Sequence, residues 1–325
     1  MICITYKSEP ERDRWIPGDR WIRPAVRRVV RGRPRPGGID KVFINLRLGL
    51  DRLGIPYEVN KPFGRLRPTD LVGVLGRGRT CLDGYTRSER LVAGIGLMTH
   101  PSEWPTIFEE FPLACYLQHS EWTANVYRAY YGDRCPIWPV GIDTETWQPG
   151  PNMNSKPVDF LIYDKIHWDR PRYESELTAP IRATLERAGK SHETLRYGSY
   201  SGADFKAALN RCKAAIFLSA HESQGIACEE ALSSGVAVLA WDPGFCQDPE
   251  RFKWGSPTIP TTSVPYFDAR CGLRFTDSPD FERALPRFLE SMDRSAHRPR
   301  DYILENLTVE KCSQKFVDLL RENLA

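Results

Sequence analysis

Two successive sets of short apolar segments, each interleaved with amphipathic ones, limit what this 325-residue chain can fold into. In the first set, short apolar runs predict strands at residues 2–6, 55–59, 71–75, 91–98 and 112–117. Apolar residues at helical spacing predict helices at residues 39–53 and 121–131. Strands that alternate with helices form parallel sheets with helices on both faces, so we expect an α/β domain.

The same alternation begins again after a polar, proline-punctuated stretch, residues 144–157, which we interpret as a linker. Strands are predicted at residues 158–163, 194–197, 214–218 and 237–240. Helices are predicted at residues 173–189, 202–211, 225–234, 280–292 and 309–324. Because the chain is long enough for two domains of ordinary size, we expect one domain at residues 1–143 and another at 144–308.

The composition is that of a globular enzyme, with 41% apolar and 27% charged residues. The longest apolar run, residues 91–98, is far shorter than the ~18 residues of a membrane-spanning helix. The N-terminus lacks the pattern of a secretory leader. Nine cysteines without a C-x-x-C pair favour buried thiols over disulfides or zinc. A cytoplasmic location is therefore expected.

The net charge of +3 conceals an uneven distribution. Residues 1–36 carry ten Lys/Arg and four Asp/Glu, a net charge of +6, so the remainder of the chain is slightly acidic. The stretch 7–36, which joins the first predicted strand to Gly37-Gly38, also contains Trp15 and Trp21. Such a concentration of arginines predicts a surface that binds an anion, although charge runs are often merely solvated.

The most informative stretch is residues 221–232, HESQGIACEEAL, which follows a buried strand and opens a helix. Glu222 falls in the turn, and Glu230 lies about two helical turns beyond it. The N-terminus of a helix presents free N–H groups and positive dipole, which suits a diphosphate. Gly225 lets a ligand approach the backbone closely, and Glu230 can accept hydrogen bonds from two ribose hydroxyls.

This stretch resembles the donor motif of the retaining GT-B glycosyltransferases of family four, in which Glu-x7-Glu carries a glycine three residues after the first Glu. Glu222, Gly225 and Glu230 match the motif. The resemblance implies a GT-B fold, with two Rossmann-like doubly wound domains facing a cleft. It also implies that Glu222 contacts the donor sugar and Glu230 the ribose, with the rest of the turn facing the donor: Ser223, Gln224 and Ile226.

Four further segments resemble the same family, in the same order along the chain. Gly37-Gly38 matches the glycine loop that faces the donor phosphates, and His100 matches the histidine near the reacting sugar. Residues 138–149 are similar to the family's interdomain segment, with Val140 in place of an asparagine. The last predicted helix, together with the C-terminal residue that follows it, spans residues 309–325. It is similar to the family's final helix, which crosses back to the N-terminal domain.

One departure concerns the cations that face the leaving diphosphate. The family has Gly-Arg, then Lys five residues later, after the first strand of the second domain. Here the stretch is YDKIHWDR, so Lys165 occupies the arginine position and Arg170 the lysine position. Both are expected to neutralise charge on the departing nucleoside diphosphate, with altered geometry because Arg and Lys are not interchangeable.

Other classes of function fit less of the sequence. A dinucleotide-dependent oxidoreductase is the first alternative, since Gly76-Arg77-Gly78 follows a strand, but Cys81 stands at the third glycine position. A P-loop enzyme would use Gly189-Lys190-Ser191, but its first glycine is missing. A metal-dependent GT-A enzyme needs a D-x-D triplet, which this sequence lacks. A non-catalytic protein that binds RNA or an anionic surface through residues 7–36 is the last alternative.

The sequence therefore predicts a retaining, metal-independent glycosyltransferase whose co-substrate is a nucleotide sugar and which needs no cofactor. By resemblance, Glu222 orients the sugar and His100 stabilises charge near the anomeric centre, together with Lys165 and Arg170. The acceptor is expected to be an anionic lipid or glycan, reached at the inner face of a membrane, and no nucleic-acid partner is expected. Four residues of the basic stretch are assigned to the acceptor side: Trp21, Arg27, Arg28 and Arg31.

Overall fold

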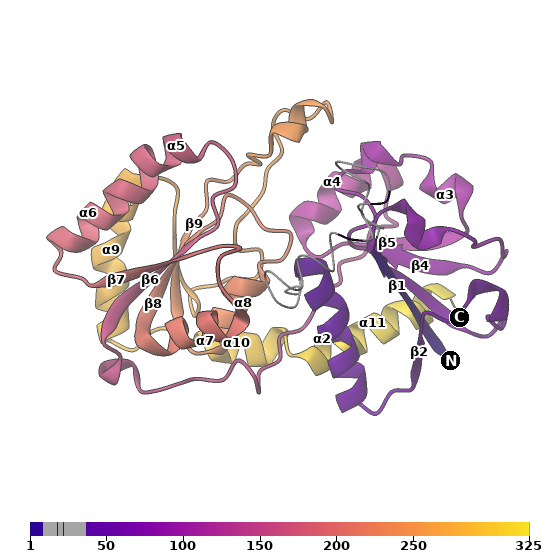
Figure 1. Ribbon diagram of the computed structural model, residues 1–325, viewed down its shortest axis with the longest axis horizontal. Helices are drawn as coiled ribbons and strands as arrows, with labels where there is room; N and C mark the ends of the chain where they lie inside the picture. The colour runs from indigo at the N-terminus through magenta and orange to yellow at the C-terminus, as the bar shows by residue number, and fades with distance from the viewer. Residues whose placement is uncertain (9–17, 19–21, 23–36, 325) are drawn as a thin grey trace. The chain divides into compact units, whose positions relative to one another are not determined.

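The computed structural model describes residues 1–8, 18, 22 and 37–324, and within them the chain forms two compact units (Figure 1). Unit 1 comprises Met1–Gln118, Tyr127–Trp138 and Ser313–Ala325. Unit 2 comprises His119–Val126 and Pro139–Cys312. The four residues assigned to the acceptor side from the sequence lie outside the described part of the chain.

Unit 1 is built on a parallel five-stranded sheet with the order β2-β1-β3-β4-β5. The strands are β1 (Ile2–Ser8), β2 (Tyr57–Val59), β3 (Leu71–Arg77), β4 (Leu91–Gly94) and β5 (Leu113–Leu117). The helices that lie wholly or partly in this unit are α2 (Gly38–Arg52), α3 (Ile107–Glu110), α4 (Glu121–Tyr131) and α11 (Val309–Leu324).

Unit 2 repeats this architecture with a second parallel sheet, in the order β10-β9-β8-β6-β7. Its strands are β6 (Val158–Asp164), β7 (His192–Arg196), β8 (Cys212–Leu218), β9 (Ala237–Trp241) and β10 (Gly272–Phe275). Its other helices are α5 (Arg170–Tyr173), α6 (Ala179–Arg187), α7 (Gly202–Arg211), α8 (Ile226–Ser233), α9 (Ser278–Asp293) and α10 (Pro299–Asn306). A π-helical turn, Glu174–Thr178, joins α5 to α6.

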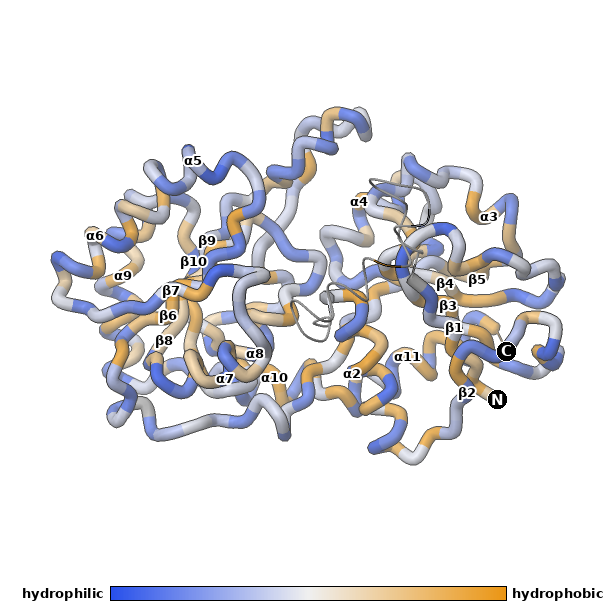
Figure 2. The backbone as a smooth tube through the Cα atoms, viewed as in Figure 1, coloured by the Kyte–Doolittle hydropathy of each residue, from blue (hydrophilic) through white to orange (hydrophobic). Residues whose placement is uncertain are grey.

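Both faces of the second sheet are covered, which explains why its central strands β6, β8 and β9 consist mostly of buried apolar residues (Figure 2). Alternate residues of β6 enter different cores: Phe160 and Ile162 pack with α6 and α9, whereas Leu161 and Tyr163 pack with α7, α8 and α10. This alternation follows from the two-residue period of a strand. The sheet is therefore the middle layer of three, with helices on each side.

Counted within its own unit, each sheet has the strand order 2-1-3-4-5. In this doubly wound order the direction of winding reverses between the first and third strands, and ligands bind beside the carboxyl ends of those strands. In unit 2 these strands are β6 and β8, and in unit 1 they are β1 and β3. The topology therefore marks the turns after β6 and β8 as the place to look for a ligand site.

The last helix, α11, begins in unit 2 and continues into unit 1, as the resemblance implied. Its Phe316 is fully buried, with its ring 4.8 Å from that of Trp138 and close against Gly73 of β3. A Cβ at Gly73 would lie 2.7 Å from the Phe316 ring, so only glycine allows this approach. Ser313 donates a hydrogen bond to the Leu46 carbonyl of α2, 3.1 Å away.

Some sequence-based boundaries were wrong. The stretch 144–157, interpreted as a linker, belongs to unit 2, because Trp147 is buried in its core and the Trp147 carbonyl accepts hydrogen bonds from Ser233 and Arg300. The strand predicted to reach Met98 ends at Gly94, because Ile95 has a left-handed backbone with φ of 54°. Strand β10 and helix α10 were not predicted.

All nine cysteines are free and buried, which confirms the prediction of buried thiols. For example, burial raises the pKa of the Cys271 thiol to about 12, so it stays protonated at neutral pH. Among the described residues, no helix combines the length and the apolar character needed to cross a bilayer.

Candidate functional site in unit 2

Lys165 and Glu222 meet at the point where the topology of unit 2 predicts a ligand site. Lys165 directly follows β6, and its backbone N–H donates to the Leu218 carbonyl at the end of β8, 2.8 Å away. Glu222 lies in the turn after β8. The Lys165 ammonium group is 2.7 Å from the Glu222 carboxylate, and both side chains remain partly exposed.

The Glu222 carboxylate has a second donor and a fixed backbone. The Ser219 hydroxyl donates to Glu222 Oε1 over 2.8 Å. The backbone N–H of Glu222 donates to the Thr262 carbonyl (3.1 Å), and its carbonyl accepts from the indole N–H of Trp122 (2.8 Å). These contacts fix the backbone of the Glu222 turn, and they hold the carboxylate against Lys165 and Ser219.

Helix α8 starts immediately after this turn, with Gly225 as its N-cap. Gly225 has a φ of 96°, a conformation that side-chain-bearing residues adopt only with strain. A Cβ there would point at Glu222 and at the Ser263 carbonyl, both 3.6 Å away. The free N–H groups at the start of α8 therefore lie next to the Glu222 turn and beside Lys165, an arrangement that suits an anion.

Glu230 lies on α8, one residue after Glu229, and both side chains are buried. Tyr200, in the loop before α7, lies near Glu230 and Glu222. Burial raises the pKa of Tyr200 to about 12, and the negative charges of the two carboxylates act in the same direction. The Tyr200 hydroxyl lies 2.7 Å from that of Tyr163 on β6.

Gln224 is almost fully buried, and its amide binds protein groups. It accepts a hydrogen bond from the Val140 N–H (2.8 Å) and donates to the Val140 carbonyl (2.6 Å) and to Glu229 (2.8 Å). Burial raises the pKa of Glu229 well above its ordinary value. Gln224, which the sequence assigned to the donor, thus fastens the turn to residues 139–142.

The Arg170 side chain also binds other groups of the protein. Its guanidinium forms two hydrogen bonds with the Asp164 carboxylate, 2.7 and 2.9 Å long, and a third with the Ile166 carbonyl, 2.9 Å long. Asp164 is the last residue of β6 and is 3% exposed. The two cations predicted to face the diphosphate therefore have different partners in this structure.

Aromatic side chains border the Glu222 turn. The His221 ring stacks on Trp168, with centroids 5.2 Å apart and an interplanar angle of 7°, and meets the edge of Trp122 at 5.9 Å. Burial lowers the pKa of His221, so the ring is neutral at neutral pH. Lys165 lies 4.8 Å from the ring centroid of Tyr197, a cation–π distance.

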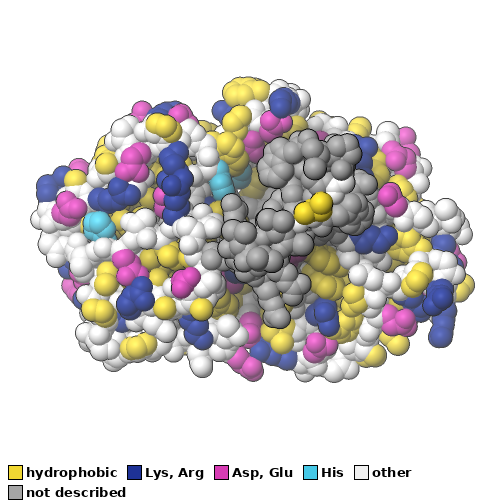
Figure 3. Space-filling view, in the orientation of Figure 1, with side chains coloured by type: hydrophobic (Ala, Val, Ile, Leu, Met, Phe, Trp, Pro, Cys, Tyr) yellow, Lys and Arg dark blue, Asp and Glu magenta, His cyan; other side chains and the backbone are white. Residues whose placement is uncertain are grey.

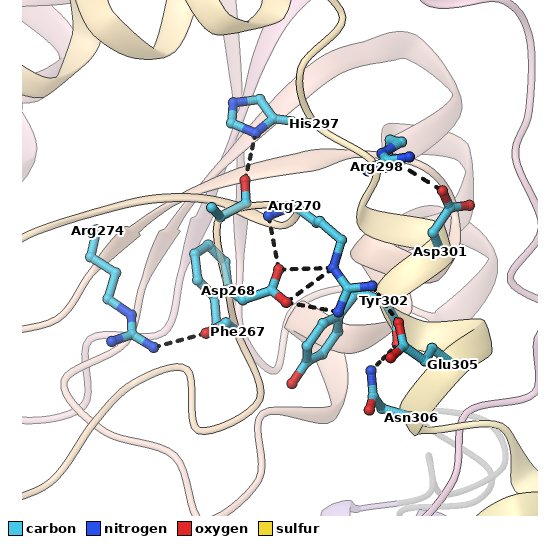
Figure 4. Close-up of polar contacts among 11 residues, drawn as sticks. Phe267, Asp268, Arg270, Arg274, His297, Arg298, Asp301, Tyr302, Glu305 and Asn306 are labelled. Carbon is cyan, nitrogen blue, oxygen red and sulfur yellow. Dashed lines mark hydrogen bonds and ion pairs between the residues drawn. The ribbon is translucent and has the colours of Figure 1, made fainter.

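The Thr262 carbonyl accepts a hydrogen bond from the Glu222 backbone, and further hydrogen bonds hold Thr262 in place. Asp242 accepts hydrogen bonds from the Thr262 hydroxyl (2.8 Å) and the Ser263 N–H (2.9 Å). The loop that follows is tied to α10 by Arg270, which binds Asp268 and Glu305 and lies over the Tyr302 ring (Figure 4). These contacts fix the loop that positions the Glu222 backbone.

Elsewhere on unit 2, charges are mostly balanced locally. On the face drawn in Figure 3, cationic and anionic side chains are interspersed. Pairs such as Arg211–Glu193 (2.8 Å) and Arg187–Glu282 (2.7 Å) lie on the surface, where ion pairs contribute little to stability.

The remaining predicted residues lie in unit 1. Gly37 is the N-cap of α2, and its N–H donates to Asp40, 2.7 Å away. Gly38 is exposed, and among the described residues no atom lies within 4 Å of the position that a Cβ would take there. His100 is 2% exposed, with Nδ1 2.8 Å from the Ser102 hydroxyl, and burial lowers its pKa. The contacts described above bring none of these three residues together with the Glu222 turn.

Sequence analysis missed several residues that organise the site. Asp164 stands where the similar family has glycine, a difference visible in the sequence. Trp122 and Thr262 contact the turn from distant parts of the chain, and Asp242 acts through Thr262, so no local signal marked these residues. Among the described residues, no cluster of three or more His, Cys, Asp or Glu side chains is arranged to hold a metal ion.

Comparison with known proteins adds to this geometry. No known family profile matches the sequence, and no curated protein matches it. Solved structures do match: a glycosyltransferase from Rickettsia africae has a TM-score of 0.55 at 10% identity, over 99% of this chain and 98% of that one. WaaG, a glycosyltransferase involved in lipopolysaccharide biosynthesis, has a TM-score of 0.53 at 12% identity, over 98% and 99% of the two chains.

A variant of S. aureus TarM, solved with UDP, fondaparinux and α-GlcNAc-glycerol, has a TM-score of 0.55 at 10% identity. This chain aligns over 86% of its own length but only 58% of TarM. The two parallel sheets, the returning C-terminal helix and these likenesses together show the GT-B fold, with two Rossmann-like units.

Proposed function

We propose that the chain is a glycosyltransferase and that unit 2 binds its nucleotide-sugar donor beside the turn after β8. The observation that carries the proposal is the position of Glu222, 2.7 Å from Lys165, between the ends of β6 and β8 and the start of α8. This is the point where a doubly wound sheet binds ligands. The fold is that of proteins described as glycosyltransferases.

In this proposal the start of α8 and Lys165 hold the diphosphate, Glu222 the sugar and Glu230 the ribose. A donor phosphate would exchange with Glu222 as the partner of Lys165, which releases the carboxylate for the sugar hydroxyls. The UDP in the TarM complex makes a uridine nucleotide one candidate donor. We further propose that transfer retains the anomeric configuration, needs no metal ion and uses His100 near the reacting carbon.

The proposed division between Glu230 and Glu222 predicts different effects of two substitutions. Glu230→Ala should weaken binding of the free nucleoside diphosphate roughly 10- to 100-fold, since a charge-assisted hydrogen bond contributes about 1.5–3 kcal/mol. Glu222→Ala should leave that affinity nearly unchanged and lower turnover of the complete donor. Isothermal titration calorimetry with uridine, guanosine and adenosine diphosphates measures the first effect.

Glu193→Ala provides a matched control. Glu193 lies near the amino-terminal ends of the strands, at the opposite end of the sheet from Glu222, and it pairs with Arg211 there. It should bind nucleotide like the unmodified protein. If Glu230→Ala bound every nucleoside diphosphate as tightly as the unmodified protein does, the assignment of the ribose to Glu230 would be wrong.

For the acceptor, we propose an anionic lipid or glycan drawn in by the basic stretch 7–36. Replacement of Arg27, Arg28 and Arg31 with glutamine should raise the KM for the acceptor and leave the KM for the donor nearly unchanged. The difference should shrink at high salt, because exposed charges are screened over about 8–10 Å at physiological ionic strength. Unchanged acceptor kinetics at low salt would show that the basic stretch 7–36 does not attract the acceptor.

A further inference from the structure

The buried carboxylate of Asp164 closes a short loop at the edge of the site. Three donors converge on it: both terminal nitrogens of Arg170, at 2.7 and 2.9 Å, and the backbone N–H of Ile166, at 3.1 Å. A carboxylate this deeply buried is costly unless it is paired and hydrogen-bonded. These three contacts meet that requirement, and they define what we call the Asp164 clasp: Asp164, Ile166 and Arg170.

The clasp holds both ends of the loop that carries Lys165. Asp164 and Arg170 border residues 165–169, and Arg170 also donates to the Ile166 carbonyl within the loop. The backbone carbonyl of Asp164 accepts from Tyr197 (2.8 Å), and the Lys165 N–H donates to Leu218 (2.8 Å). Lys165 is thus fixed between two neighbouring strands, with its ammonium group directed at Glu222.

The N–H groups with which Arg170 could bind a phosphate in a bidentate manner already bind protein groups. A guanidinium has five N–H groups in a planar fork, and bidentate recognition of an anion needs two of them side by side. In Arg170 one such pair binds Asp164, and one nitrogen also binds the Ile166 carbonyl. The Lys165 ammonium group can still bind a phosphate, because Glu222, its partner in this structure, is expected to bind the donor sugar instead.

We propose that Arg170 is a positioning residue: it binds Asp164, and through this contact it holds Lys165 in place beside the leaving diphosphate. Arg170 does not bind the diphosphate itself. This inference rests on the proposed function, in which Lys165 binds the diphosphate, and it replaces the expectation from the sequence that Arg170 binds the diphosphate as well. The exchange of Lys and Arg relative to the similar family then has a physical reason. The planar fork matches the buried carboxylate, and the single ammonium group is left for the ligand.

A double-mutant cycle separates this role from direct binding. Arg170→Gln should lower kcat roughly 10- to 100-fold, the effect of a reacting group displaced by about 1 Å, with little change in the affinity for free nucleoside diphosphate. In an Asp164→Asn background, Arg170→Gln should cause no further loss. A direct ligand would instead weaken nucleotide binding by the same factor in both backgrounds, which would overturn the proposal.

Amide hydrogen exchange supplies a readout that does not depend on activity. Arg170→Gln should increase exchange at the Ile166 amide several-fold, whereas Arg187→Gln, which breaks an exposed pair with Glu282, should not. Unchanged exchange at Ile166 would also overturn the proposal. If the unmodified protein bound no nucleoside diphosphate, the proposed function would fail, and the exchange experiment would still decide whether the clasp holds the loop.

Discussion

Replacement of Lys165 with alanine is expected to lower turnover by about 100- to 1,000-fold. Loss of one preorganised group that stabilises developing charge typically adds about 2.7–4 kcal/mol to the barrier. Lys165 is placed for this task by the strand ends on both sides of it, and it already holds a carboxylate oxygen at 2.7 Å. Steady-state kinetics with the complete donor, under saturating conditions, measures the change in kcat.

Two further variants make this result specific. Lys165→Arg keeps the charge and should retain much more activity than the alanine variant, since the similar family carries Arg at this position. Lys213→Ala removes a lysine that pairs with Asp159 (2.8 Å) near the opposite edge of the sheet, and it should turn over normally. Equal losses in the variants at positions 165 and 213 would mean that the effect arises from stability rather than from the site.

The second large effect concerns the fold. Phe316→Ala is expected to lower the free energy of unfolding of unit 1 by about 3–5 kcal/mol, the usual cost of removing a buried aromatic ring. The ring is fully buried, 4.8 Å from the ring of Trp138, and it lies against Gly73 of β3, which has no side chain of its own to fill the space that the ring leaves. Chemical denaturation followed by tryptophan fluorescence measures the loss.

Lys315→Ala is the matched control on the same helix, because Lys315 is exposed next to Phe316. It should change stability by less than about 0.5 kcal/mol. A Phe316→Ala protein that unfolds at the same denaturant concentration as the unmodified chain would show that α11 contributes little to unit 1.

Much of the fold was predictable because the helices and strands of both units follow simple periodicities. Helices Gly202–Arg211, Glu121–Tyr131 and Val309–Leu324 have the boundaries that their apolar spacing predicted. The strands were found because both faces of each sheet are buried, so their residues form short continuous apolar runs.

The exceptions have local causes. Strand β10 is only four residues long and contains Arg274, so it gives no apolar run. Helix α10 has only eight residues, which gives too few turns for a clear period. Trp147 looked like part of a linker because its neighbours are polar, and only the folded chain shows the core that it enters.

At the site, the sequence identified the turn and its chemistry but not the partners. Glu222 and Lys165 were each selected from local motifs, although their contact joins residues 57 apart. The bonds between Gln224 and Val140 join residues 84 apart, and no local pattern announces them. Tertiary contacts of this kind decide whether a polar residue in a motif faces a ligand or holds the loop.

The account rests on donor chemistry at unit 2, and release of nucleoside diphosphate from nucleotide sugars measures it most directly. The unmodified protein and Lys165→Ala should be incubated in EDTA with a panel of uridine, guanosine and adenosine diphosphate sugars, with NAD⁺ as a comparison. We expect at least one nucleotide sugar to be cleaved without added metal, and far more slowly by the variant. A panel left intact by the unmodified protein, or cleavage that Lys165→Ala does not diminish, would contradict the account.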